Sequence, residues 1–87
     1  MILPSAFTTT LAVYRLTTSP DAVERLRLTH RIVTLIGQSE GEAVVPTWFQ
    51  GMNPQLGDRS PARVLHEDLF EEAGPRVLAA ANAFVGA

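Results

Sequence analysis

The chain has 87 residues, a formal net charge of −2 and no cysteine. Its length accommodates one domain with a modest core, and a hydrophobic content of 46% argues against disorder. The lack of cysteine excludes a disulfide framework and a cysteine zinc site. No apolar run approaches the ~18 residues of a membrane span, and no secretory signal pattern follows Met1. We therefore expect a cytoplasmic protein without a membrane partner.

Residues 1–18 are predicted to form an N-terminal extended arm or short strand. The run Thr8-Thr9-Thr10 has restricted side-chain rotamers and favours β structure, although Phe7, Leu11 and Tyr14 also fit helical spacing. The apolar side chains of the arm are expected to cover part of the core or a partner. Because β-leaning arms can pair across a two-fold axis, we predict self-association through the arm as a homodimer.

Residues 20–37 are predicted to form the longest helix. Ser19 is a suitable N-cap, and Pro20 suits the first helical position. Apolar positions recur along a broad stripe at helical spacing, which comprises Val23, Leu26, Leu28, His30, Ile32, Val33, Leu35 and Ile36. Gly37 is predicted to end the helix.

A second helix is predicted to begin near residues 43–45, because Pro46 is tolerated only in a first turn. Val44, Val45, Trp48, Phe49 and Met52 form its apolar face, with Trp48 as the core anchor. Gly51 and the Asn53-Pro54 pair are expected to end it. A tight connection over residues 55–59 follows, with Leu56 as its apolar anchor.

Three further segments complete the predicted fold. Ser60-Pro61 is expected to open a short third helix that continues to about His66. Residues 67–72 are acidic and suit one more short helical turn, and Gly74-Pro75 is predicted to restart the chain as a last helix that ends at Gly86. Residues 19–87 are thus predicted to form an all-α domain, a small bundle of four to five helices.

No catalytic constellation is visible in the sequence. It has no phosphate-binding glycine loop and no known nucleophile or metalloprotease motif. His30 is expected at the edge of the core, and His66 at a helix C-terminus that favours positive charge. The acidic run over residues 67–72 fits a solvated face and, as an alternative, a surface that complements a basic partner. We predict a protein-binding module, not an enzyme, without cofactor or metal.

The most distinctive segment runs from Trp48 to Pro61. As structural residues, Trp48 and Leu56 anchor the segment in the core, and Pro54 and Gly57 form the turn. Ser60 and Pro61 open the next helix. The order Trp, Asn-Pro-x-Leu-Gly, Pro also resembles the toxin-binding domain of the Xre/MbcA/ParS antitoxins, over about residues 20–87. The family commonly has a second glycine at the position of Asp58. That departure is predicted to be tolerated if Gly57 alone supplies the positive φ.

The resemblance implies an antitoxin that neutralises a RES-domain, NAD-degrading toxin by covering its active-site entrance. Relatives of this family also carry an N-terminal helix-turn-helix, which residues 1–18 are too short to supply. All seven basic residues are arginine, as expected of a GC-rich genome such as that of an actinobacterium or its phage. Because no basic stripe is present, direct nucleic-acid binding is not expected.

Partner-binding residues are predicted around the motif and the last helix: Asn53, Gln55, Asp58, Arg59, Arg63, Glu71, Glu72 and the terminal carboxylate of Ala87. Arginines are common interface anchors, although Arg63 could instead pair with Glu67 and Arg59 could cap a local carbonyl. Two other functions stay open at this point. One is a phage- or host-encoded helical interaction protein, and the other is a small DNA-binding regulator.

Overall fold

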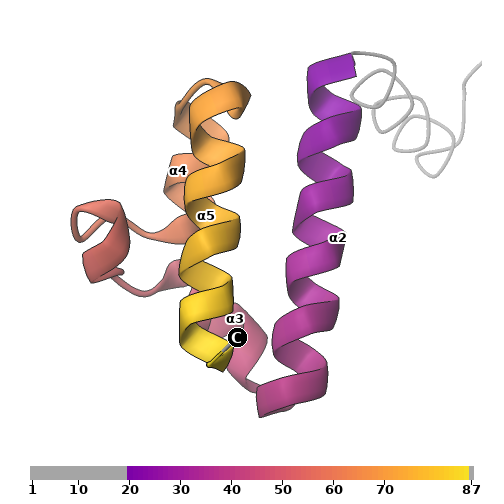
Figure 1. Ribbon diagram of the computed structural model, residues 1–87, viewed down its shortest axis with the longest axis vertical. Coiled ribbons are helices and arrows are strands. Elements are labelled where there is room, and N and C mark those ends of the chain that lie inside the picture. The colour runs from indigo at the N-terminus through magenta and orange to yellow at the C-terminus, as the bar shows by residue number, and fades with distance from the viewer. Residues whose placement is uncertain (1–19, 87) are drawn as a thin grey trace, which may run out of the picture.

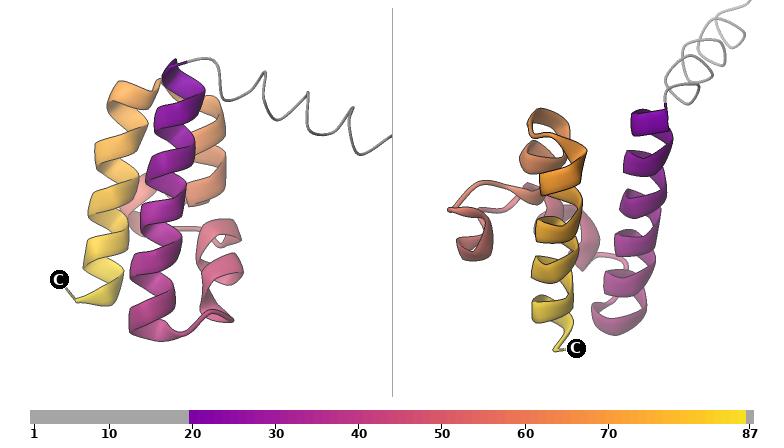
Figure 2. Two further views of the ribbon diagram at one scale, coloured as in Figure 1. Left: turned by 90° about the vertical axis from the view of Figure 1, so that its right-hand side faces the viewer. Right: turned by 45° about the horizontal axis from the view of Figure 1, so that its top comes forward.

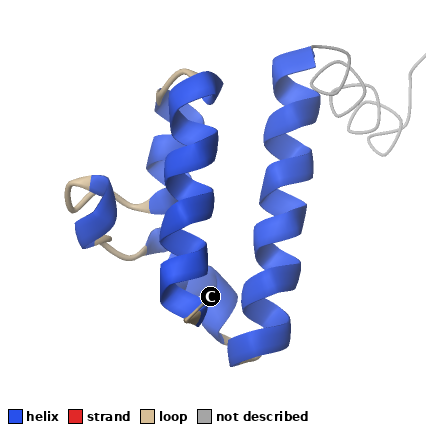
Figure 3. Cartoon of the chain, viewed as in Figure 1, coloured by secondary structure: helices blue, strands red, loops and turns tan. Residues whose placement is uncertain are grey.

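The computed structural model describes residues 20–86, which form an all-α bundle (Figures 1 and 3). The elements are α2 (Pro20–Glu40), α3 (Val44–Gln50), the 3₁₀ helix η1 (Pro54–Leu56), α4 (Pro61–Glu67) and α5 (Phe70–Val85). The predicted all-α class and helix number are confirmed. The predicted arm, the cap Ser19 and Ala87 lie outside the described residues. No helix within the described part combines the length and apolar character needed to cross a membrane.

The two long helices, α2 and α5, lie side by side and run in the same direction (Figure 1). Seen from the side of α2, α5 lies behind one edge of that helix, and α3 and α4 lie behind the other (Figure 2). The buried apolar side chains come from all the elements: Ile32, Ile36, Trp48, Leu56, Val64, Leu65, Ala73, Val77, Ala80 and Ala81. Alanines on α5 let its neighbours approach closely, so this small domain has one continuous core.

The end predicted for α2 is wrong by one turn, because Gly37 lies inside the helix and Gly41 ends it. Gly41 has a φ of 94°, and its N–H donates to the Gly37 carbonyl at 3.0 Å, which is the left-handed helix ending that favours glycine. Gly37 instead faces α3, where a Cβ would stand 3.9 Å from a methyl of Val45. This is an ordinary van der Waals distance, so the approach of α3 does not require glycine at this position.

The last helix also begins earlier than predicted. α5 starts at Phe70 and continues through Gly74-Pro75, although proline in a helix interior removes a hydrogen bond. Phe70, one turn earlier in the same helix, covers Gly74 with its ring, and a Cβ at Gly74 would lie 3.2 Å from that ring. Ala73 and Val77, on either side of Gly74-Pro75, are both buried in the core, which favours a helix that continues across this local stop signal. The predicted end at Gly86 is confirmed, with a φ of 80°.

The broad apolar stripe predicted for α2 is divided by the fold. Ile32 and Ile36 are fully buried, whereas Leu26 and Val33 keep 50% and 38% of their surface exposed. His30, predicted at the core edge, is exposed. Only one side of the stripe therefore reaches the core of the described residues.

Candidate functional site

The residues between α3 and α4 form a closed loop, residues 53–59, which we call the motif loop. Its ends meet in a single antiparallel bridge, in which the Asn53 N–H donates to the Arg59 carbonyl at 3.2 Å. The Asn53 carbonyl accepts from the N–H groups of Leu56 and Asp58, each at 2.9 Å. The Asn53 side chain accepts from the Gln55 N–H at 3.0 Å. Leu56, only 1% exposed, anchors the loop in the core as predicted.

The tip of the motif loop is a tight turn with two residues in the left-handed region. Gly57 has the predicted positive φ, 67°, but Asp58 also has a positive φ, 64°. The assumption that Gly57 alone supplies the positive φ is therefore wrong. Two successive positive φ values are typical of type I′ turns, which favour glycine or Asn and Asp. Aspartate tolerates this conformation better than most residues but not as well as glycine.

The structural residues on either side of the loop lie where the sequence predicts them. Trp48 is 8% exposed in the core, with its ring 5.1 Å from that of Phe49 in an edge-on arrangement. Ser60 caps α4 by accepting from the Arg63 N–H at 3.1 Å, and Pro61 in the first turn is buried. The loop is thus held between two elements of the core.

A hollow of about 490 Å³ opens beside the motif loop, between the end of α3 and the last turns of α5. We call it the motif hollow. Gly51, Ala80 and Ala83 leave space in it, and no charged residue lines it. Met52 and Phe84 line it as well, with 82% and 45% of their surfaces exposed. Met52, predicted on the apolar face of α3, lies past the end of that helix and outside the core.

Asn53 and Gln55 also line the motif hollow, so two of the predicted partner-binding residues lie together there. Met52 and Phe84 were missed as site residues. Both apolar side chains fit a helical core pattern, and nothing in the sequence distinguishes an exposed position from a buried one at these points. Phe84 lies in the last turn of α5, which ends at Val85.

Arg59 has a different environment from Asn53 and Gln55. Its guanidinium makes a two-pronged ion pair with Asp68, at 2.9 Å and 2.8 Å, and donates to Glu67 at 3.2 Å. The predicted carbonyl cap by Arg59 is absent among its hydrogen bonds in the described residues. Arg63 pairs with Glu67 at 3.0 Å, as its alternative reading predicted. Val64 and Leu65 beside it face the core as predicted.

Asp68, at the corner between α4 and α5, joins the motif loop to α2. Its carbonyl accepts from Arg25 at 2.7 Å, and Arg25 also donates to the carbonyl of Leu65 at the end of α4. The Arg25 guanidinium lies 5.8 Å from the centre of the Phe70 ring. The acidic run predicts a solvated position for Asp68, but its side chain is only 24% exposed. Arg59, Arg76 and Arg25 are nine, eight and 43 residues away from Asp68, so no local helical pattern reveals these partners.

The contacts between Asp68 and Arg59 shift the pKa values of both groups. Hydrogen bonds from Arg59 are the main cause that lowers the pKa of Asp68 below its ordinary value of 3.8, and the positive charges of Arg59, Arg76 and Arg25 add to the effect. Partial burial opposes it. In turn, the hydrogen bond to Asp68 raises the pKa of Arg59. Both groups are therefore charged at neutral pH, as a structural ion pair requires.

The other predicted partner-binding residues are spread over the surface. Asp58 is exposed at the loop tip, and Glu71 and Glu72 are exposed on the first turn of α5. Glu71 lines a second hollow with Leu69, Phe70, Asp21 and Glu24. The structure therefore divides the predicted site into a neutral surface at the motif hollow, an ion-paired corner and an acidic rim.

Within residues 20–86, no group of three or more acidic or histidine side chains is arranged to hold a metal ion. Comparison with protein-family models, curated proteins and solved structures finds no match to this chain.

Proposed function

We propose that this chain is an antitoxin-like protein-binding module that neutralises a RES-type, NAD-degrading toxin by covering its active-site entrance. In this proposal the chain binds a protein in the cytoplasm and catalyses no reaction itself. The observation that carries the proposal is the motif hollow, where exposed Met52 and Phe84 flank the motif loop.

The composition of the motif hollow favours a protein partner. Exposed methionine and aromatic side chains are enriched at interfaces, because they contribute large apolar areas. The Asn53 and Gln55 side chains at the hollow can orient a partner backbone through hydrogen bonds. Without charges, the hollow suits an apolar side chain of a partner better than an anionic small molecule.

The conformation of the motif loop supports the resemblance to the Xre/MbcA/ParS family. The position of Asp58, where that family commonly has glycine, has a positive φ in this chain. A glycine preference at this position therefore has a physical reason in the loop. The motif's tryptophan, leucine and second proline, here Trp48, Leu56 and Pro61, are all buried.

The proposal is tested with the purified chain and RES-domain toxins captured from the source cells. Wild-type protein should suppress NAD loss catalysed by the captured toxin. Met52→Arg should weaken inhibition by about tenfold or more, because a buried anchor at an interface contributes ~1–2 kcal/mol. Met52 lies past the end of α3 and is almost fully exposed, so this change should leave the melting temperature unchanged.

Leu69→Arg is the matched control, since Leu69 is also apolar and 71% exposed but lies at the second hollow. It should inhibit like the wild type. If Leu69→Arg loses inhibition and Met52→Arg keeps it, the acidic rim is the binding surface and the motif hollow is not. If no RES-domain protein binds the chain, the proposed function is wrong.

A further inference from the structure

Met52 supplies a thioether to the motif hollow. Its side chain is 82% exposed and lies past the end of α3, outside the core. The chain has no cysteine and only two methionines, Met1 and Met52, so Met52 is the only sulfur-containing residue within residues 20–86. Trp48, the only tryptophan of the chain, lines the same hollow but is 8% exposed. An oxidant that enters the motif hollow from solvent therefore meets the Met52 sulfur first.

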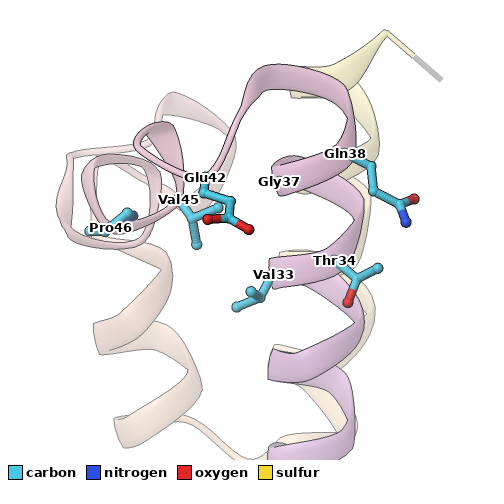
Figure 4. Close-up of a pocket in the computed structure, with 7 residues that line it drawn as sticks. All are labelled: Val33, Thr34, Gly37, Gln38, Glu42, Val45 and Pro46. Carbon is cyan, nitrogen blue, oxygen red and sulfur yellow. The ribbon is translucent and has the colours of Figure 1, made fainter.

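Two other hollows of the described residues have different linings. The second hollow, at Leu69, is lined by three carboxylates. A hollow of about 480 Å³ between α2 and α3 contains the Glu42 carboxylate beside Val45, with Val33 across the gap (Figure 4). Neither lining contains sulfur. Of these three hollows, the motif hollow alone combines an exposed thioether with a lining free of charge.

We propose that Met52 is an oxidation site through which peroxides control what the motif hollow binds. A sulfur lone pair attacks one peroxide oxygen, so that an S–O bond forms and the O–O bond breaks. The second oxygen leaves as hydroxide and takes up the remaining peroxide proton to become water. The sulfur loses two electrons and the peroxide gains them. The product, methionine sulfoxide, is polar, whereas the thioether is apolar, and methionine sulfoxide reductases reverse the change.

The oxidation should leave the fold intact. The exposed Met52 side chain contributes little to the core, and an oxygen added to it stays in contact with water. On one side of Met52, the Gly51 N–H donates to the Thr47 carbonyl at 2.9 Å. On the other side, the Asn53 N–H donates to the Arg59 carbonyl at 3.2 Å. The backbone around Met52 is thus held by hydrogen bonds that do not involve its side chain.

The sulfoxide makes the motif hollow a poorer site for an apolar group. A sulfoxide oxygen is a hydrogen-bond acceptor, and burying it under an apolar group without a donor is unfavourable. Asn53 and Gln55 line the hollow, and their side-chain NH₂ groups donate no hydrogen bond within residues 20–86. They can donate to the new oxygen instead of to a partner backbone. The oxidised chain therefore binds an apolar partner surface more weakly; for a RES-type toxin, this consequence rests on the proposed function.

Treatment of the full chain with hydrogen peroxide tests the oxidation site without a toxin. Peptide mass spectrometry should find one added oxygen on Met52, and circular dichroism should find an unchanged melting temperature. Native hydrophobic-interaction chromatography should elute the oxidised chain earlier than the reduced chain. Met52→Leu is the control, because it keeps Met1 and an apolar side chain in the hollow, and its elution should shift much less. An unoxidised Met52, a lowered melting temperature or an equal shift in Met52→Leu would overturn the proposal.

Inhibition of a captured RES-domain toxin tests the effect on binding, after the peroxide has been removed. The oxidised wild type should inhibit about tenfold more weakly than the reduced wild type, and methionine sulfoxide reductase should restore inhibition. A double variant, Met52→Leu with Leu69→Met, moves the thioether to a position that is 71% exposed at the second hollow. Its inhibition should not respond to peroxide.

Equal inhibition by the oxidised and reduced wild type would overturn the control of the motif hollow by Met52. A reduced wild type that does not inhibit the toxin contradicts the proposed function instead. In that case the mass and elution measurements still decide whether Met52 is the oxidation site and whether its sulfoxide weakens apolar binding.

Discussion

Replacing Asp58 with glycine should stabilise the chain. Asp58 has a φ of 64°. The left-handed conformation destabilises a residue with a Cβ by roughly 1–2 kcal/mol, and it destabilises aspartate by less. Glycine removes that strain but loses more conformational entropy on folding, roughly 0.5–1 kcal/mol. No hydrogen bond or ion pair of the described residues uses the Asp58 side chain, so nothing else is lost. The expected net gain is ~0.5–1 kcal/mol.

Thermal unfolding followed by circular dichroism measures this gain. For a domain of this size, it corresponds to a rise of roughly 2–8 °C in melting temperature. Asp58→Ala keeps the Cβ and should be no more stable than the wild type. Asp58→Val adds a β-branched side chain and should be less stable by about 1–2 kcal/mol. If Asp58→Gly were the least stable of the three, the turn geometry at the loop tip would be wrong.

Three further substitutions test the core, the last helix and the ion-paired corner. Trp48→Ala should cost ~3–5 kcal/mol and largely unfold the chain; an unchanged melting temperature would contradict its core position. Pro75→Ala should stabilise α5 by ~1–3 kcal/mol in urea unfolding, because it restores a donor to the Glu71 carbonyl and Pro75 is exposed; a destabilised variant would contradict this. The carboxylate of Asp68 has a lowered pKa. Its stabilising effect is therefore fully present at pH values above the ordinary pKa of an aspartate, and it is lost as pH falls through the lowered pKa. Between pH 7 and about pH 3, wild-type melting temperature should therefore fall further than that of Asp68→Asn; equal falls would refute this role for the ion pair.

The helices of this chain are predictable where local signals and packing agree. Pro20, Ser60 and Gly86 mark helix ends by their backbone preferences alone, and the structure has helix boundaries at each. Gly37 and Pro75 are stop signals that the fold overrides. Gly37 lies inside α2, and Gly74 lies under the Phe70 ring one turn into α5. The packing of α2 against α5 joins residues distant in sequence, and tertiary contacts of this kind can override local propensity.

The candidate site was only partly predictable. Asn53 and Gln55 belong to a turn motif, and the motif hollow lies beside them. The sequence predicts core positions for Met52 and Phe84, because both fit a helical apolar pattern. Their exposure instead depends on where the helices end and which neighbours cover them. Asp68 belongs to an acidic run, and its role arises from Arg59 and Arg25, which only the folded chain brings to it.

Inhibition of NAD loss is the most direct test of the central claim, that the motif hollow is a binding surface for a RES-type toxin. The assay titrates the wild-type chain, Met52→Arg and Leu69→Arg against a captured RES-domain toxin. We expect full inhibition by the wild type and by Leu69→Arg, and inhibition about tenfold weaker by Met52→Arg. A toxin that continues to consume NAD at saturating wild-type chain would contradict the account.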